Sequence, residues 1–264
     1  MSTPANSPGN PEVPTEPAVT LREIRPGILQ VTMQDRAHKN TFSEAILSGL
    51  ADAFAAVGAS ASCKAVILTG YDTYFCSGGT QEALMALQGS PDRRFTDVSI
   101  TYQLALECPV PVIAAMQGHA IGGGLVMGLY CDLVVMSRES VYSTNFMRYG
   151  FTPGMGGTFI VPHKLGQALG VEMLLTGSNY RGADLERRGV GFPVVPRTEV
   201  MDHALRLAEN LAEKPRTSLT TLKRHLTEPV RTALPATISS EVAMHARTFH
   251  QPEVRERILA LFGR

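Results

Sequence analysis

The stretch HAIGGGLVMGLYCD, residues 119–132, decides the fold and much of the candidate site. It follows the apolar run PVPVIAAMQG, which is typical of a buried strand whose prolines lie at its start. Glycine can take a positive φ angle and lets a ligand approach the backbone, and the first amides of a helix are unpaired and partly positive. The triple glycine therefore predicts a turn that can stabilise an anion. The apolar helical turns that follow it carry neither an acid nor a base.

A second stretch repeats this order of elements. Residues 68–84, LTGYDTYFCSGGTQEAL, also run from an apolar strand through a glycine pair into a helix. A single glycine-rich turn is usually only a turn, but two helix starts that converge could direct two backbone amides at one oxyanion. Neither stretch fits G-x-G-x-x-G or G-x-x-x-x-G-K-[ST], which argues against a dinucleotide site or a P-loop.

Strands and helices alternate through residues 19–197, and this alternation predicts an α/β core. Short apolar runs at residues 28–33 (ILQVTM) and 64–70 (KAVILTG) indicate strands. Between them we expect a helix, because its apolar residues recur at intervals of three and four. Thr41 and Glu44 have the spacing of a capping box at the start of that helix.

The two ends of the chain differ from this core. Residues 198–264 are predicted to form a helical C-terminal region, with helices at 200–214, 218–226 and about 236–262. Residues 1–18 are rich in proline and nearly devoid of large apolar side chains. Such a segment buries too little surface to offset its ordering entropy, so we expect a disordered leader.

Composition narrows the class of protein. The chain has 264 residues, 44% of them hydrophobic and 18% charged, and its 24 basic and 24 acidic residues balance to a net charge of +0. A nucleic-acid binder usually carries a basic excess, so we expect no nucleic acid as partner. No run of about eighteen apolar residues predicts a membrane span. We expect a cytoplasmic protein with reduced thiols, because its four cysteines lack C-x-x-C spacing (Cys63, Cys76, Cys108 and Cys131).

Five stretches carry a resemblance to a known family: DRAHKNTFSEAIL, AVILTGYDTYFCSGGTQEAL, PVPVIAAMQGHAIGGGLVMGLYCDLVVMSRESVYST, GFTPGMGGTFIVPHKLGQALGVEMLLTG and GADLERRGVG. In this order and spacing they resemble the crotonase (enoyl-CoA hydratase/isomerase) superfamily. The resemblance implies a core of ββα spiral repeats and a homotrimer or hexamer. It also implies an acyl thioester substrate on the phosphopantetheine of an acyl carrier protein or coenzyme A, with no further cofactor and no metal. The matching positions place the two oxyanion-hole amides at Gly79 and Gly123.

The positions at which hydratases of this superfamily carry two glutamates are occupied here by Val126 and Phe146. Neither side chain can activate water by proton transfer. We therefore expect both to be walls of the substrate pocket in an enzyme that is not a hydratase. Decarboxylation fits what remains, because loss of carbon dioxide from an acyl thioester leaves an enolate or dienolate and no proton need be removed. A dry pocket favours it, since the carboxylate loses more by leaving water than the delocalised product anion does.

The segment MHARTFHQPEVRERI near the C-terminus resembles one branch of the superfamily, the decarboxylases of polyketide β-branching cassettes. The resemblance implies conversion of 3-methylglutaconyl to 3-methylcrotonyl on an acyl carrier protein. It places a histidine at His245, which would protonate the dienolate or orient the substrate carboxylate. Imidazole suits proton transfer because its pKa lies near neutrality.

What holds the substrate carboxylate stays open at the level of sequence. The candidates are Gln81 on the first turn after the glycine pair, Arg93 and Arg94 in the loop beyond it, and Arg148. Hydrophobic surroundings alone are a further alternative. The basic segment that contains Lys39 is expected to meet the phosphate of the pantetheine arm or to be an ordinary solvated loop.

Two other functions remain as alternatives to the decarboxylase. An isomerase of enoyl thioesters would need a group that removes and redelivers a proton, and neither expected acid is present. A catalytically silent homologue that binds acyl carriers would need only the cavity. The isomerase would shift a double bond at constant mass, and the silent homologue would bind thioesters without changing their mass.

Overall fold

The structure is a computed structural model that describes residues 16–88 and 101–262. Most of the predicted leader and the loop that contains Arg93 and Arg94 lie outside these described residues. The expectations for both segments therefore stay predictions.

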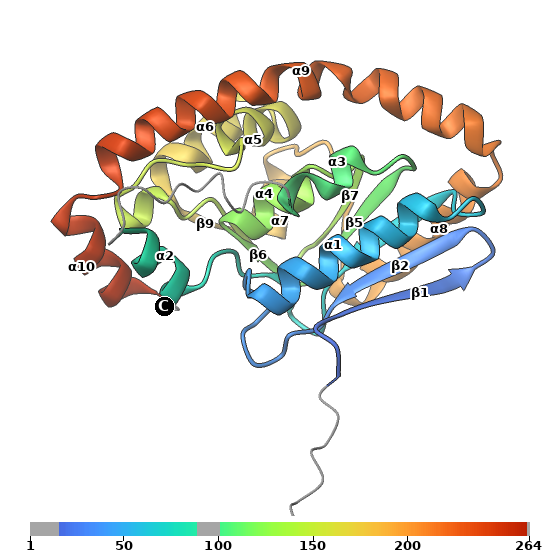
Figure 1. The fold of residues 1–264 in the computed structure, drawn as a ribbon, viewed down its shortest axis with the longest axis horizontal. Helices are drawn as coiled ribbons and strands as arrows, with labels where there is room; N and C mark the ends of the chain where they lie inside the picture. The colour runs from blue at the N-terminus through green and yellow to red at the C-terminus, as the bar shows by residue number, and fades with distance from the viewer. Residues whose placement is uncertain (1–15, 89–100, 263–264) are drawn as a thin grey trace, which may run out of the picture.

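Six strands of the described chain form the larger sheet, in the order β1-β2-β3-β5-β7-β10 (Figure 1). Only β1 and β2 pair antiparallel, and every later neighbour is parallel. This mixed sheet with helices around it confirms the predicted α/β class. The strands are β1 (Val19–Arg25), β2 (Ile28–Met33), β3 (Ala65–Thr69), β5 (Val112–Met116), β7 (Leu133–Ser137) and β10 (Val194–Val195).

The central strands of the larger sheet are buried on both faces, which explains why β3 and β5 read as continuous apolar runs. Successive side chains of a strand point to opposite faces. In β3, Val66 and Leu68 belong to the larger core, whereas Ala65 and Ile67 belong to a smaller core. The smaller core is closed by helix α8 (Val200–Ala212).

Four short strands form a second sheet, in the order β4-β6-β8-β9. β4 and β6 run parallel, so their carboxyl ends lie at the same edge, and each is followed by one of the two glycine turns. The small sheet thus brings together two segments that lie far apart in the sequence. Its strands are β4 (Tyr74–Cys76), β6 (His119–Ile121), β8 (Val141–Ser143) and β9 (Asn179–Arg181).

Helix α1 (Glu44–Ala59) begins at a different cap from the one predicted. The N-cap is Ser43, whose Oγ accepts from the amide of Ile46, so the prediction of a capping box at Thr41 was wrong. Tertiary structure explains the difference, because Thr41 is buried and its backbone forms a parallel bridge with Gly78 of the first glycine turn. The other helices before α8 are α2 (Gln81–Gln88), α3 (Leu104–Glu107), α4 (Gly123–Leu129), α5 (Gly157–Leu165), α6 (Gln167–Thr176) and α7 (Gly182–Arg187).

The C-terminal region is helical, as predicted, but its boundaries differ. Helix α9 (Arg216–Thr248) is continuous and arches over one whole side of the molecule (Figure 1), although Pro229 and Pro235 lie inside it. The prediction of two separate helices there was wrong. Each proline removes one helical hydrogen bond, yet side chains anchor α9 along its length. The chain breaks instead before α10 (Pro252–Leu261), because the residue that precedes a proline favours an extended backbone.

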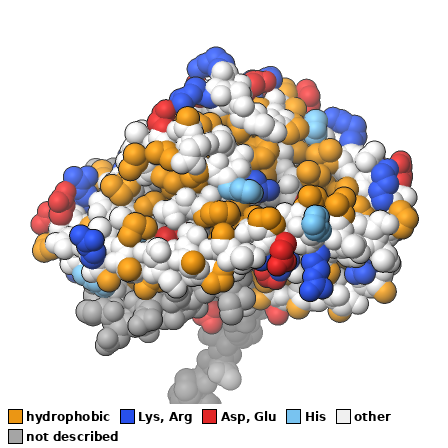
Figure 2. Space-filling model, turned by 90° about the horizontal axis from the view of Figure 1, so that it is seen from above, with side chains coloured by type: hydrophobic (Ala, Val, Ile, Leu, Met, Phe, Trp, Pro, Cys, Tyr) orange, Lys and Arg blue, Asp and Glu red, His pale blue; other side chains and the backbone are white. Residues whose placement is uncertain are grey.

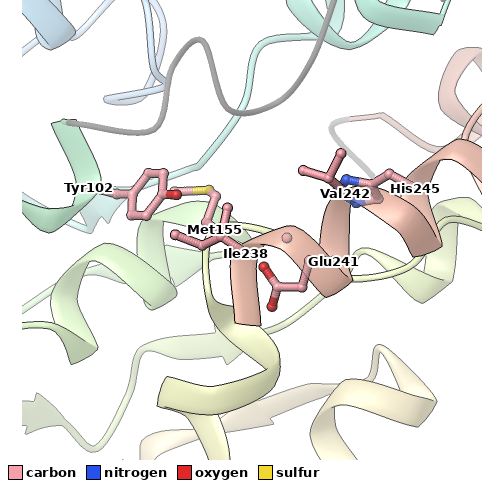
Figure 3. Close-up of a pocket in the computed structure, with 7 residues that line it drawn as sticks. Tyr102, Met155, Ile238, Glu241, Val242 and His245 are labelled. Atoms are coloured by element: carbon pink, nitrogen blue, oxygen red, sulfur yellow. The ribbon is translucent and has the colours of Figure 1, made fainter. Parts of the chain in front are cut away.

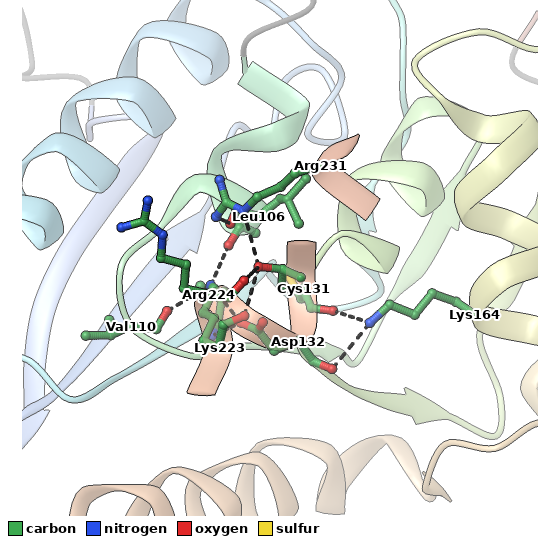
Figure 4. A network of polar contacts seen from close by, with 11 residues as sticks. Leu106, Val110, Cys131, Asp132, Lys164, Lys223, Arg224 and Arg231 are labelled. Atoms are coloured by element: carbon green, nitrogen blue, oxygen red, sulfur yellow. Dashed lines mark hydrogen bonds and ion pairs between the residues drawn. The ribbon is translucent and has the colours of Figure 1, made fainter. Parts of the chain in front are cut away.

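A buried ion pair anchors α9 to the core (Figure 4). The ammonium of Lys223, whose residue is 4% exposed, lies 2.8 Å from Oδ2 of Asp132 and donates to the carbonyls of Ala105 and Val110 over 2.8 and 3.0 Å. The same carboxylate oxygen accepts from the amide of Val112 at the start of β5. Asp132 thus ties the end of the fold-deciding stretch to both the large sheet and α9.

The surface above α9 carries side chains of both charges with apolar groups between them (Figure 2). Among the described helices, none combines the length and the apolar character that a bilayer crossing requires. All four cysteines are buried and unpaired, as the sequence predicted.

Candidate active site

The two glycine turns contact each other. Gly78 has a φ of +77°, and a Cβ built on it would lie 2.6 Å from the carbonyl oxygen of Ile121 and 3.2 Å from the amide nitrogen of Gly123. Only glycine fits a backbone that approaches its neighbour so closely in this conformation. The first turn is held in turn by the amide of Phe42, which donates to the Gly78 carbonyl over 2.7 Å.

Gly79 and Gly123 both line the same cavity, whose volume is about 550 Å³. Gly79 precedes α2, and Gly123 is the first residue of α4. Within residues 16–88 and 101–262, neither amide nitrogen donates a hydrogen bond to the protein. Two unpaired amides in one cavity are the arrangement that a bound oxyanion requires.

The cavity is mainly apolar and aromatic. Of the described residues that line it, none is Asp or Glu. Phe146 is buried in the wall with its ring edge-on to Phe151 at 6.1 Å, whereas Val126 is fully buried and does not line the cavity. The apolar and aromatic side chains of the wall include Phe42, Leu84, Phe146, Tyr149, Phe151 and Phe262.

The C-terminal end of α10 helps to close this cavity. Tyr149 is stacked between Phe151 and Phe262, with ring centroids 6.1 and 6.2 Å apart. Burial raises the pKa of the Tyr149 phenol. The last turn of the described chain therefore forms part of the wall, next to residues that follow β8.

Arg148 is the predicted carboxylate-binding residue that lines the cavity. Its side chain is half-buried, and among the described residues no acidic side chain pairs with it. An unpaired guanidinium at an apolar wall is well suited to bind a carboxylate in two-pronged fashion. Gln81, the other predicted polar group, begins α2 but does not line the cavity.

Polar residues of the cavity wall that the sequence analysis missed include His119 and Asn145. His119 accepts at Nδ1 from the amide of Val141 over 2.9 Å, and burial lowers its pKa, so the ring is neutral with its hydrogen on Nε2. Asn145 packs against the second glycine turn, where a Cβ on Gly122 would lie 2.6 Å from its Oδ1. A histidine inside a strand and an asparagine after one give no signal without the fold.

His245 lies beside the large cavity rather than in its wall. It lines a separate cavity of about 10 Å³ together with Tyr102, Met155 and Glu241 (Figure 3). Tyr102 and Met155 line both cavities, and Phe151, which lines the large cavity, packs edge-on against the His245 ring with the ring centroids 6.1 Å apart. His245 Nε2 lies 2.5 Å from the carbonyl oxygen of Thr152. Burial lowers the pKa of the imidazole, against the effect of that carbonyl, which raises it.

Glu241 is an acid near the site that the sequence analysis did not single out. It is 2% exposed and points at the start of α5. Its carboxylate accepts from the amide of Gly156 over 2.7 Å and from the amide and hydroxyl of Thr158 over 2.8 and 2.6 Å. Burial raises its pKa. Because both oxygens accept hydrogen bonds from the protein, Glu241 serves as a helix cap and not as a base that holds water.

The basic segment before α1 lies at another part of the cavity. His38 and Lys39 line it, and the ammonium of Lys39 lies 5.7 Å from the centre of the Tyr74 ring. Arg36 does not line it, because its guanidinium is paired with Asp72 over 2.5 Å. Lys39, the residue expected to meet the phosphate of the pantetheine arm, is thus brought to the cavity, and its role stays a prediction.

Comparison with known proteins places this site in context. The chain is similar to bacillaene synthase decarboxylase PksI of Bacillus subtilis (strain 168), with 58% identity over 249 residues, 94% of this chain and 99% of the relative. A solved structure from a dehydratase/decarboxylase enzyme couple involved in polyketide beta-branching matches with a TM-score of 0.91 and 58% identity, covering 94% of this chain and 100% of that one. The ECH2 decarboxylase domain of CurF from Lyngbya majuscula matches with a TM-score of 0.89 and 44% identity, covering 93% and 100%.

A more distant structure, an enoyl-CoA hydratase from Bacillus halodurans, shares the fold at 23% identity, with a TM-score of 0.82 over 92% of this chain and 100% of that one. The predicted crotonase-like fold is confirmed by these matches. So is the prediction of a decarboxylase-type enzyme rather than a hydratase, because the relatives with 58% and 44% identity are decarboxylases. Residues 23–262 match the enoyl-CoA hydratase/isomerase family, and the chain belongs to that family.

Proposed function

We propose that this enzyme removes carbon dioxide from a 3-methylglutaconyl-type thioester and releases a 3-methylcrotonyl thioester. The observation that carries the proposal is the large cavity. It contains the amides of Gly79 and Gly123, Phe146 stands where hydratases carry a glutamate, and none of its described lining residues is Asp or Glu. The decarboxylase relatives of polyketide biosynthesis support the same reaction class.

The reaction needs few groups. The bond between the γ carbon and the carboxylate breaks, carbon dioxide leaves, and the electron pair moves through the double bond onto the thioester oxygen. The resulting dienolate is stabilised by the Gly79 and Gly123 amides, which act where the negative charge develops. The thioester itself accepts the electron pair, so the chemistry requires no cofactor.

Arg148 is proposed to hold the substrate carboxylate before it leaves. The apolar wall that includes Phe146 weakens the hydration of that carboxylate and so favours its loss. A glutamate at residue 146 would instead repel the substrate carboxylate in this low-dielectric cavity.

His245 is proposed to protonate the dienolate. Its Nε2 donates to the Thr152 carbonyl, so the proton given to the substrate is one that Nδ1 first takes up from solvent, and its transfer returns the ring to the neutral form. The imidazole reaches the substrate only if the wall between the two cavities opens. Met155 is the group expected to move, because its side chain lines both cavities and is unbranched and flexible.

The thioester is proposed to be carried by the phosphopantetheine arm of an acyl carrier protein, with the arm passing Lys39 at the cavity. A homotrimer or hexamer is proposed as the working assembly. Light scattering on the purified protein tests the assembly, and a monomer in solution would contradict it.

The reaction is tested by mass spectrometry on acyl carrier protein loaded with 3-methylglutaconyl. The expected result is loss of the mass of one carbon dioxide, with one solvent deuterium in the product in heavy water. The matched control is 3-methylcrotonyl carrier protein, which has no carboxylate to lose. A shifted double bond at constant mass would favour an isomerase, binding without any change would favour a silent carrier-binding homologue, and either result would overturn the proposal.

A further inference from the structure

Helix α9 presents two ionisable side chains, one turn apart, to a single loop. Glu241 and His245 lie four residues apart, which places them on the same face of the helix. Figure 3 shows Glu241 and His245 on this stretch of α9, and Met155 beside Tyr102 and Ile238. Both contact residues 152–158, named loop 152–158, which comprise the loop up to Gly156 and the first two residues of α5.

Glu241 holds the C-terminal half of that loop. The amides of Gly156 and Thr158 and the Thr158 hydroxyl all donate to its carboxylate, over 2.6 to 2.8 Å. The Gly156 amide is buried, so it has no water to turn to, and Thr158 is half-buried. A buried amide that loses its acceptor is costly, and the loop would therefore move if the carboxylate were replaced.

His245 contacts the N-terminal half of the same loop. Its Nε2 lies 2.5 Å from the Thr152 carbonyl, and a Cβ on Gly154 would lie 2.6 Å from its Cε1. The imidazole thus packs closely against the backbone of Gly154 and contacts the Thr152 carbonyl, so a movement of the loop changes both contacts. The position of the imidazole depends on the position of the loop, and the loop depends on Glu241.

Met155 lies between these two points of attachment. Its carbonyl accepts from the Tyr130 hydroxyl over 2.8 Å, and its sulfur is 2.7 Å from the place where a Cβ on Gly123 would stand. The loop thus carries one side chain that packs against Gly123 and lines the small cavity together with His245. If the loop moves, the packing of Met155 against Gly123 and its position in the cavity that it shares with His245 change together.

We propose that Glu241 is a positioning residue, which fixes loop 152–158 so that the proton from His245 reaches one carbon of the dienolate. This inference rests on the proposed function. The dienolate is basic at two carbons: a proton on the γ carbon gives 3-methylcrotonyl, and a proton on the α carbon gives the isomer with a β,γ double bond. A proton donor that is held in a fixed position reaches only one of the two carbons and gives one product. A displaced donor, or solvent, can protonate either carbon and gives both products.

The variant that tests this is Glu241→Gln, in which one acceptor oxygen is replaced by an NH2 group that faces amide donors. We expect kcat to fall roughly a hundredfold, as for a displacement of about 1 Å at a reacting centre, with KM little changed. We also expect the β,γ isomer to appear among the products, as measured by proton NMR in heavy water. Thr158→Val removes only the hydroxyl contact, and we expect a smaller change in the same direction.

The control variant is Glu172→Gln, the same chemical change at a carboxylate that accepts from Tyr180 and Arg188 but lines neither cavity. It should leave kcat and the product ratio unchanged. A folded Glu241→Gln enzyme with the wild-type kcat and product ratio would overturn the assignment. If that variant does not fold, an unchanged product ratio in Thr158→Val overturns it. Failure of the wild type to release carbon dioxide would overturn the proposed function itself, and this assignment with it.

Discussion

Replacing Gly78 with alanine tests whether contact between the two glycine turns sets the oxyanion site. The backbone at Gly78 has a φ of +77°, which costs an ordinary L-residue about 1–2 kcal/mol. The added Cβ would also lie 2.6 Å from the Ile121 carbonyl and 3.2 Å from the Gly123 amide, both of which are backbone atoms. Backbone cannot rotate away as a side chain can, so one turn must shift by several tenths of an ångström.

This shift moves the Gly79 amide relative to the Gly123 amide. If one of the two no longer reaches the thioester oxygen, kcat should fall by roughly 10²- to 10³-fold, the usual effect of losing one oxyanion-hole donor. KM should change much less, because the ground-state carbonyl carries little charge. The assay is decarboxylation of the carrier-bound thioester, measured together with the free energy of unfolding in urea.

Two alanine controls separate the contributions. Gly189 has the same φ of +77° but nothing among the described residues within 4 Å of its Cβ position, so Gly189→Ala should lose about 1 kcal/mol of stability and no activity. Gly58 in α1 also has an open Cβ position, and Gly58→Ala should gain about 0.5–1 kcal/mol. If Gly78→Ala behaves like Gly189→Ala, with full activity, the contact between the turns does not set the site and the reasoning is refuted.

Three further predictions follow from buried or half-buried charges. Arg148→Gln should raise KM for the carboxylated thioester by roughly ten- to a hundredfold and leave binding of the product thioester unchanged; equal losses for both would contradict its role. His245 has its pKa lowered by burial, so the unfolded chain takes up a proton before the folded one as pH falls below about 6.5, and stability falls through that window; His245→Gln should reduce this slope in urea titrations and leave the share that comes from His119, and an unchanged slope would refute it. Asp132→Asn leaves the Lys223 ammonium buried without its counter-charge and should cost about 3–5 kcal/mol in urea unfolding, much of which Lys223→Met should restore; a loss below about 1 kcal/mol would show that the pair is not an anchor.

The fold could be predicted largely from apolar periodicity and glycine turns, because both are local signals. The run at residues 64–70 is apolar at consecutive positions since β3 is covered on both faces, and this follows from its sequence alone. The exact cap of α1 could not be predicted. Ser43 and Thr41 are equally good caps locally, and the pairing of Thr41 with Gly78 settles the choice.

The residues of the candidate site also fall into two groups, those that could be predicted from the sequence and those that could not. Gly79 and Gly123 lie in sequence motifs and Phe146 lies between two of them, and the structure brings all three to one cavity. Glu241 and His119 could not be found from the sequence, because their environments are made by contacts with segments far away in the chain. Glu241 caps a helix that begins more than eighty residues earlier, at a separation of 83 to 85 residues.

Helix α9 has 33 residues and continues through two prolines. Its side chains contact both the core and the loop beside the cavity, so this one helix contributes to the stability of the fold and to the geometry of the site. Near its start Lys223 enters the core and binds Asp132, which ends the stretch that carries Gly123. Near its end Glu241 and His245 hold the loop beside the cavity. A break at either proline would uncouple these points, and the histidine would no longer have a fixed relation to the oxyanion amides. The helix must therefore stay intact for the site to exist, although no residue of α9 lines the large cavity.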